Sequence, residues 1–270
     1  MMLPLTLEVI TYLLIVFSIG LIALKAKAVD FGGAVACILL GSLILIGGGW
    51  LWFIIMIVFF IVSIQFTRFR YNDKKELGFA QEKGGIRSWP NALANGGVAS
   101  IFAISEFFFG GGIYAVAFLG AMASATADTL ATEIGLLSKQ HPKLITNLKK
   151  TVPIGTSGGV TPIGTISSFF ASLFIGVVAI FLGIVEALPW EILIIVTSGG
   201  FIGCLVDSIL GATIQRVGRC RICGKTTDNI KHCGKPIERL RGFNYVDNNV
   251  VNFLSTFLGA TSAMALFLLI

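Results

Sequence analysis

Eight long apolar segments take up most of this chain of 270 residues. Each is close to the length of about 20 residues that an α-helix needs to cross the hydrocarbon core of a bilayer. The segments cover residues 5–24, 31–48, 50–66, 91–108, 112–127, 161–185, 189–214 and 250–270. Only 13% of all residues are charged, whereas a soluble domain has about 25%. The sequence therefore predicts an all-α, polytopic bundle of about eight transmembrane helices, with a single transmembrane domain over residues 1–270.

Two pairs of these segments are separated only by glycines, at residues 47–49 and 110–112. Glycine runs favour tight turns, so each pair is expected to form a helical hairpin. The fourth and fifth segments themselves contain several glycines. Either one could instead be a re-entrant helix, because backbone at membrane depth can leave the helical conformation where protein buries it.

The 20 lysines and arginines test this span count independently. All of them lie in the loops after the first, third, fifth and seventh segments, and the other loops and both ends of the chain have none. Cytoplasmic loops of membrane proteins are enriched in Lys and Arg. These four loops are therefore predicted to be cytoplasmic, with both termini outside. The first segment has no basic n-region and no small-residue cleavage site, so we expect a retained helix in a multi-pass protein of the cell membrane.

The net charge of +6 is accordingly concentrated on the predicted cytoplasmic side. Topology and attraction to anionic lipid headgroups explain much of this charge. A basic entrance that attracts a phosphorylated substrate is the alternative explanation. Nucleic acid is not expected as a partner, and the oligomeric state does not follow from the sequence.

The inner end of the fifth segment combines small residues with two carboxylates. Residues 123–135 include Asp128 and Glu133 in a run of Ala, Ser, Thr and Gly. Small residues allow helices to approach closely, and a carboxylate in a membrane helix usually has a partner or binds an ion. Alternatively, Asp128 marks the water boundary and caps a helix that begins there.

A glycine-rich stretch precedes the sixth segment. Glycine permits close backbone approach, hydroxyl groups can donate to phosphate oxygens, and the N-terminus of the following helix presents free N–H groups to an anion. The stretch matches neither a Walker A motif nor a dinucleotide fingerprint, and Gly and Thr are also ordinary packing residues in membrane helices. Its candidate phosphate-binding residues are Gly155, Thr156, Ser157, Gly158, Gly159 and Thr161.

The inner end of the seventh segment resembles that of the fifth. Asp207 is followed by Ser208 and an aliphatic residue, as Asp128 is followed by a hydroxyl and an aliphatic residue. Two carboxylates at the same depth are an arrangement that holds Mg²⁺ against substrate phosphates. Ion-coupled transport uses intramembrane acids as well, so a cation-coupled transporter is the principal alternative.

A separate set of metal-binding residue types lies in the predicted cytoplasmic loop at residues 216–248. Cys220 and Cys223 form a Cys-x-x-Cys pair, and His232 and Cys233 follow in the same loop. Three thiolates and an imidazole can complete the tetrahedral shell of Zn²⁺. The spacing is similar to zinc-finger patterns without matching them, and four reduced side chains without metal are the alternative, since cytoplasmic disulfides are rare.

Several of these motifs together resemble a family of integral membrane proteins whose characterised plant member is the chloroplast phytyl-phosphate kinase. The resemblance covers residues 84–252 in the expected order. The matching motifs are Gly85-Ile86-Arg87 with Ala94-Asn95-Gly96, the run from Ser124 to Gly135, the run from Gly155 to Thr161, the run from Asp207 to Gln215, and His232-Cys233-Gly234 with Asp247-Asn248 and Val251-Asn252.

This resemblance implies a membrane-embedded prenyl-phosphate kinase. It transfers a phosphoryl group from a nucleoside triphosphate, CTP in the plant relatives, to an isoprenyl or phytyl monophosphate and forms the diphosphate. Another CTP-dependent lipid kinase or a nucleotidyltransferase is the enzyme alternative. The implied partners are the lipid bilayer, the nucleoside triphosphate and the isoprenyl monophosphate.

The chemistry of phosphoryl transfer assigns roles to the candidate residues. It depends on positioning and on charge neutralisation around the transferred group. We expect Asp128 and Asp207 to hold Mg²⁺, with Glu133 as a third catalytic carboxylate. Interhelical hydrogen bonding explains the polar candidates near helix ends equally well, and topology alone accounts for an arginine on this side. The expected substrate-binding or nucleotide-binding residues, besides the glycine-rich stretch, are Arg87, Asn95, Ser208, Gln215 and Asn252.

Overall fold

The computed structural model describes residues 7–81, 84–224 and 226–270. The beginning of the first predicted span, at Leu5, and two of the loop cations, Lys83 and Lys225, lie outside the described residues. The described chain forms eight α-helices and eight short strands. Their bounds are α1 (Leu7–Lys25), α2 (Phe31–Arg68), α3 (Tyr71–Glu76), α4 (Trp89–Phe109), α5 (Ile113–Gly135), β1 (Lys143–Leu144), β2 (Asn147–Thr151), β3 (Gly159–Val160), α6 (Pro162–Leu182), α7 (Pro189–Thr213), β4 (Val217–Arg219), β5 (Thr226–Thr227), β6 (Lys231–His232), β7 (Lys235–Pro236), β8 (Glu238–Arg241) and α8 (Asn248–Leu269).

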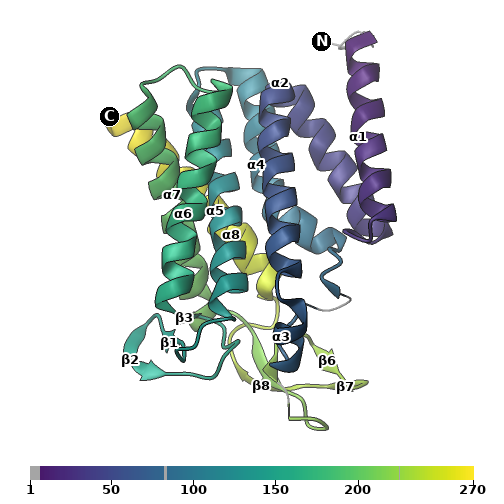
Figure 1. Ribbon diagram of the computed structural model, residues 1–270, viewed down its shortest axis with the longest axis vertical. Helices are drawn as coiled ribbons and strands as arrows, with labels where there is room; N and C mark the ends of the chain where they lie inside the picture. The colour runs from purple at the N-terminus through teal and green to yellow at the C-terminus, as the bar shows by residue number, and fades with distance from the viewer. Residues whose placement is uncertain (1–6, 82–83, 225) are drawn as a thin grey trace.

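The long helices form one bundle, and the strands gather at one end of it (Figure 1). The beginning of α1 and the end of α8 lie at the opposite end. Six helices are long and apolar enough to cross a membrane, namely α2, α4, α5, α6, α7 and α8. The prediction of a polytopic helical membrane protein is therefore confirmed. The count of eight crossings and the external position of both termini stay predictions.

Helix α2 contains the second and third predicted spans in its 38 residues. Its backbone breaks at Gly49, where φ is 77° and ψ is −167°. The two halves fold back on each other. Side-chain atoms of Phe53 and Met56, in the second half, lie 3.0 and 3.2 Å from the position that a Cβ atom on Gly41, in the first half, would take. The predicted hairpin at residues 47–49 is thus present.

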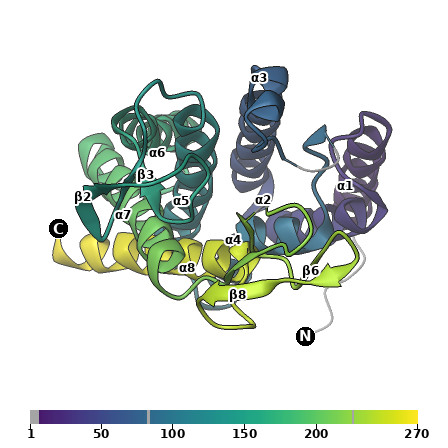
Figure 2. The same cartoon turned by 90° about the horizontal axis from the view of Figure 1, so that it is seen from below.

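Helix α5 is the central helix of the bundle. In its most apolar window 83% of the residues are buried, against 33–44% in the other five candidate spans. Both α4 and α5 are continuous helices, of 21 and 23 residues, so neither is broken inside, and each is long enough to cross a membrane. Figure 2 shows α1 at one edge of the bundle, beside α2 and away from α5, α6 and α7.

The loops at the strand end contain β-structure that the sequence does not predict. One small sheet has the strand order β2-β1-β3, a second has the order β5-β4-β8, and β6 pairs with β7. Most of these strands have only two or three residues, and β2 is exposed along its length. Strands this short have no alternating apolar pattern, which is the signal that predicts a strand.

A buried ion pair connects α3 to α5. The ammonium Nζ of Lys74 lies 2.5 Å from Oε2 of Glu133, and the two side chains are 1% and 3% exposed. Lys74 also donates to the backbone oxygens of Phe66 and Thr67, at 2.9 and 2.8 Å, near the end of α2. The side chain of Gln81 donates to Oε1 of Glu133 at 2.8 Å. This network joins the ends of α2, α3 and α5.

We predict that Lys74→Met lowers the free energy of unfolding by about 3–5 kcal/mol, because it leaves the Glu133 carboxylate buried without its cation. The double variant Lys74→Met/Glu133→Gln should recover most of this loss. Thermal unfolding of the purified protein in detergent measures the effect. The matched control is Asp73→Asn, which breaks the exposed Arg70–Asp73 pair and should cost no more than about 1 kcal/mol. An equal effect of Asp73→Asn and Lys74→Met would contradict the role of burial.

Candidate functional site

A polar cavity of about 200 Å³ opens among α5, α6 and α7 at the strand end of the bundle. The two aspartates, one from α5 and one from α7, face it together with the loop that precedes α6. The predicted site residues in its lining are Asp128, Gly155, Thr156, Ser157, Gly158, Gly159, Thr161, Asp207, Ser208 and Gln215.

The carboxyl groups of Asp128 and Asp207 lie close enough to interact directly. Both residues are only partly buried because they line the cavity. The hydroxyl of Ser255 in α8 donates to Oδ2 of Asp207 at 3.0 Å. The Asn252 amide, oriented to donate, reaches the same oxygen at 3.3 Å. Two like charges at this separation repel each other strongly unless a proton or a cation lies between them.

Small residues allow α5 and α7 to approach closely enough for this contact. A Cβ atom added at Gly203 of α7 would lie 2.7 Å from Cβ of Ser124 in α5 and 3.0 Å from the backbone oxygen of Ser255 in α8. Real carbon atoms do not approach so closely, so a larger residue at 203 would separate the helices. Gly203 is one helical turn before Asp207 and Ser124 is one turn before Asp128, so the close approach sets the distance between the carboxylates.

The glycine-rich stretch, residues 155–161, forms a wall of the cavity that the two aspartates also line. Gly158 has φ of 79°, and a Cβ atom there would lie 2.6 Å from Cα of Ala212 in α7, so this position requires glycine. Thr161 caps α6, because its Oγ1 accepts from the N–H of Gly164 at 3.1 Å. Thr161 and Gly164 line the cavity at the beginning of α6, but Pro162 has no N–H and the N–H of Gly164 is taken by Thr161.

Arg241, in β8, is a residue that the sequence analysis missed. Its guanidinium donates to the backbone oxygens of Gly211 and Ala212 at 3.0 and 2.6 Å, and to that of Ser157 at 2.8 Å. The first two acceptors are carbonyls in the last turn of α7, where helical partners are absent. One side chain thus fixes the glycine-rich wall against α7, and it connects the cavity to the loop at residues 216–248.

Four predicted residues do not line this cavity. Glu133 is occupied by Lys74 and Gln81, so it is not placed to share a cation with the two aspartates. Arg87 and Asn95 line a different pocket, between α1, α2 and α4. Asn252 lies behind Asp207 and contacts it instead of the cavity.

The structure adds polar groups to the site that were not predicted. Thr165 and Ser168 of α6 line the cavity, as does Asn248 at the start of α8. The side chain of Gln215 donates to Oδ1 of Asn248 at 3.4 Å. Thr161, Thr165 and Ser168 follow each other at helical spacing, so a hydroxyl stripe on one face of the sixth span was the signal available in the sequence. Within the described residues, no lysine or arginine lines this cavity.

The predicted Cys/His set forms a second, compact cluster in the loop between α7 and α8. One possible ligand atom from each of Cys220, Cys223, His232 and Cys233 lies within 4.8 Å of all the others. Nδ1 of His232 is 3.4 Å from Sγ of Cys223 and 3.3 Å from Sγ of Cys233. A tetrahedral metal with bonds of about 2.0–2.3 Å places its ligands at similar separations. The cluster can therefore hold a metal ion.

The thiols of this cluster differ in acidity. Backbone N–H groups of Cys223 and Ile222 point at Sγ of Cys220 and lower its pKa to about 6. The thiol of Cys223 raises the pKa of Cys233 to about 11, with smaller contributions from burial and from the thiol of Cys220. Thiolates crowded in this way repel each other, and a bound cation removes the repulsion because metal coordination deprotonates thiols outright.

Comparisons with known proteins agree with this architecture. Protein PGR of Arabidopsis thaliana is 31% identical over 264 residues, which cover 87% of this chain and 87% of that protein. The uncharacterized membrane protein MJ0933 of Methanocaldococcus jannaschii is 31% identical over 206 residues, or 76% of this chain and 83% of that protein. Protein VTE6, chloroplastic, of Arabidopsis thaliana is 25% identical over 256 residues, or 93% of this chain and 68% of that protein.

No solved structure matches the chain. The family described as integral membrane protein DUF92 matches residues 14–260, which is most of the sequence. The matched residues include both aspartates, the glycine-rich wall and the Cys/His cluster. The chain therefore belongs to the DUF92 family of integral membrane proteins.

Proposed function

We propose that the cavity is the active site of a prenyl-phosphate kinase. In this reaction a nucleoside triphosphate, with CTP as the expected donor, gives its terminal phosphoryl group to an isoprenyl or phytyl monophosphate. The observation that carries the proposal is the pair of interacting carboxylates, Asp128 and Asp207, in one cavity with the glycine-rich wall. The motif resemblance to the family of the plant phytyl-phosphate kinase supports the same reaction.

The two aspartates fit a Mg²⁺ ion in their chemistry. Carboxylate oxygens are the preferred protein ligands of Mg²⁺, which is usually bound through one or two carboxylates and the substrate phosphates. Asp128 and Asp207 would hold the ion, while Ser255 and Asn252 orient Asp207 through Oδ2. When bound, Mg²⁺ neutralises charge on the phosphates of the donor.

The protein side of the mechanism consists of positioning and charge stabilisation. The wall from Gly155 to Thr161 offers polar groups, among them the hydroxyl of Ser157, to phosphate oxygens. The hydroxyls of Thr165 and Ser168 extend this surface deeper into the bundle. The attacking nucleophile is an oxygen of the acceptor phosphate, so no protein nucleophile is required.

A cation-coupled transporter would also use two intramembrane acids. Such a protein needs polar groups along a path from one membrane face to the other. In α5 the buried residues from Ala115 to Ala123 are all apolar or glycine, and the polar residues begin at Ser124. The polar cavity thus lies at one end of the central helix, which favours a one-sided enzyme.

The test is an assay of the purified protein with Mg²⁺, labelled CTP or ATP, and geranylgeranyl or phytyl monophosphate. We expect formation of the prenyl diphosphate. Asp128→Asn and Asp207→Asn should each lower kcat at least about a hundredfold, as the loss of a group that stabilises transition-state charge does.

Asp73→Asn is the matched control, because this exposed carboxylate lies in α3 away from the cavity, and its kcat should stay unchanged. Circular dichroism and gel filtration verify that each variant is folded. Absence of diphosphate with every donor, combined with substrate-dependent cation flux in liposomes, would establish the transporter instead. Full activity of both aspartate variants would remove these residues from the mechanism.

We also propose that the cluster of Cys220, Cys223, His232 and Cys233 binds a structural Zn²⁺ ion. Three sulfur ligands and one nitrogen are a common structural zinc shell. The cluster lies in the same loop as β8, so a metal there would fix the strand from which Arg241 reaches the glycine-rich wall. Its role is to order the loop, since all four ligand positions are filled by protein.

Metal analysis of the purified protein tests this proposal. We expect about one zinc per chain, and loss of that zinc in Cys223→Ser and Cys233→Ser, because a structural zinc site uses four protein ligands. Cys37→Ser is the matched control, since Cys37 lies in α2 outside the cluster, and it should retain the zinc. The result that overturns the assignment is an unchanged zinc content in both cluster variants.

A further inference from the structure

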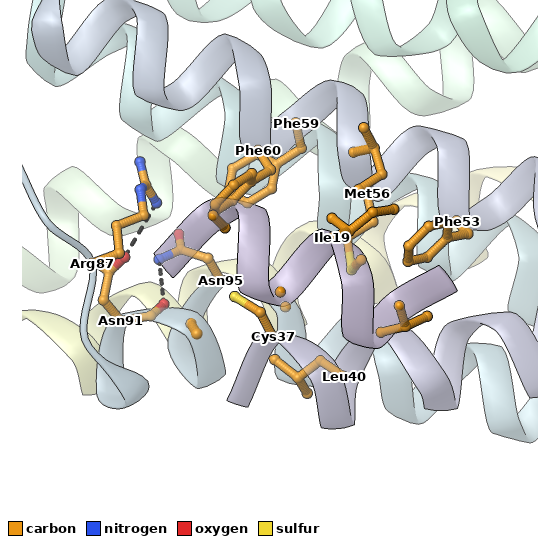
Figure 3. Close-up of a pocket in the computed structure, with 16 residues that line it drawn as sticks. Ile19, Cys37, Leu40, Phe53, Met56, Phe59, Phe60, Arg87, Asn91 and Asn95 are labelled. Carbon is orange, nitrogen blue, oxygen red and sulfur yellow. Dashed lines mark hydrogen bonds between the residues drawn. The ribbon is translucent and has the colours of Figure 1, made fainter. Parts of the chain in front are cut away.

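A second pocket lies between α1, α2 and α4, on the other side of the bundle from α6 and α7. Its cavity volume is about 60 Å³, and apart from Cys37, Arg87, Asn91 and Asn95 its lining side chains are apolar. Figure 3 shows three polar side chains, Arg87, Asn91 and Asn95, together at one end. The apolar lining labelled in the same view comes from Ile19, Leu40, Phe53, Met56, Phe59 and Phe60.

Arg87 is buried in this pocket with few partners. Its side chain is 7% exposed. Nη1 donates to Oδ1 of Asn91 at 3.2 Å, whereas Nε has no hydrogen-bond partner among the described residues. The guanidinium carbon lies 5.8 Å from the ring centroid of Phe59. A buried polar group without a partner is costly, so this arrangement favours an additional acceptor.

The acidic group that acts on Arg87 most strongly is Glu133. That carboxylate already forms the 2.5 Å ion pair with Lys74 and accepts from Gln81. Its charge is therefore shared between two cations, and Arg87 stays charged at any physiological pH. An anion that approaches Arg87 gains the charge, and the buried Nε becomes its donor when the guanidinium turns toward it.

The shape of the pocket adds an apolar requirement. Arg87 lies just before α4. On α1 the lining begins at Ala23, close to the end of that helix at Lys25. From Ala23 to Val16 the lining follows α1 for two turns, which is about 10 Å toward the middle of the bundle. Beyond it, α1 has its exposed apolar side chains, such as Leu14 at 62%, so this edge of the bundle faces lipid.

We propose that this pocket binds a single-chain anionic amphiphile. The phosphate or carboxylate head accepts hydrogen bonds from Arg87, beside Asn91 and Asn95, and the first carbons of the chain lie along the apolar faces of α1 and α2. The small volume accepts one chain, whose remainder continues into the bilayer. The two pockets share no lining residue, so binding here is tested separately from the reaction proposed for the cavity.

The test uses a photoreactive dodecyl phosphate with a diazirine in the chain, applied to the full-length protein in nanodiscs. We expect crosslinks in α1 and α2 near Ile19 and Met56, mapped by mass spectrometry. Arg87→Gln should weaken binding about tenfold or more, the effect of losing a charged hydrogen bond. Arg68→Gln is the matched control, because Arg68 is an exposed cation at the same end of the bundle that contacts Ala26 and Lys27 instead of the pocket.

A second pair of variants tests the chain-binding part even if Arg87→Gln does not fold. Ile19→Trp fills the pocket from α1 and should reduce crosslinking about tenfold, whereas Leu14→Trp on the exposed face of the same helix should not. Crosslinking that is equal in Ile19→Trp and Leu14→Trp overturns the proposed location. Asp207→Asn should leave the labelling unchanged, which separates this site from the cavity.

Competition identifies the natural source of the head. Displacement by farnesyl monophosphate assigns the pocket to a prenyl-phosphate substrate, and displacement by dodecanoate assigns it to a fatty-acid anion of the bilayer. Either result supports the proposal. Equal displacement by dodecanol, which has no charge, or by two-chain phosphatidate overturns it.

Discussion

The interaction between the carboxyl groups of Asp128 and Asp207 is the constraint on which the rest of this structure depends. A carboxylate inside a membrane protein costs several kcal/mol unless it has a partner, and here two of them lie together. The bundle brings them together through small residues in α5, α7 and α8, where Gly203 leaves room for Ser124. Ser255 and Asn252 then orient one of the two carboxylates. Two charged carboxylates in this arrangement repel each other unless a proton or a cation lies between them.

The loops at the strand end complete the site because their side chains hold the backbone around the cavity in place. Arg241 joins the last turn of α7 to Ser157 in the glycine-rich wall, and Gln215 contacts Asn248 at the start of α8. The first contact joins the loop that holds the Cys/His cluster to α7, and the second joins the two ends of that loop. The cavity is formed by membrane helices and by the loop between α5 and α6. Between Gln215 and Asn248, the described part of the Cys/His loop does not line it but holds the loop before α6 against α7 through Arg241.

Much of the fold follows directly from the sequence. Apolar runs of spanning length predict the helices, and the glycines at residues 47–49 predict the break at Gly49. The paired Asp-hydroxyl-aliphatic motifs place Asp128 and Asp207 at one depth, which the structure bears out by bringing them into one cavity. The spacing of the Cys and His residues likewise predicts a cluster that the folded loop forms.

Other parts of the site depend on which helix packs beside which, and this does not follow from local pattern. Glu133 is five residues from Asp128, yet it faces Lys74 from a distant short helix. Arg87 and Asn95 belong to the same membrane end as the aspartates, but they line the pocket beside α1. In the sequence Arg241 is one of many loop cations that the membrane topology explains, whereas in the fold it contacts the end of α7. In each case the deciding partner is far away in the chain.

The most direct test of this account is whether the two aspartates together form a cation site. Electron paramagnetic resonance with Mn²⁺, which replaces Mg²⁺ at oxygen sites and has its own signal, counts the ions bound by the purified protein at equilibrium. We predict at least one bound Mn²⁺ per chain that is lost in Asp128→Asn/Asp207→Asn, while the helical content stays unchanged. The same amount of bound Mn²⁺ in the wild type and in this double variant would contradict the account.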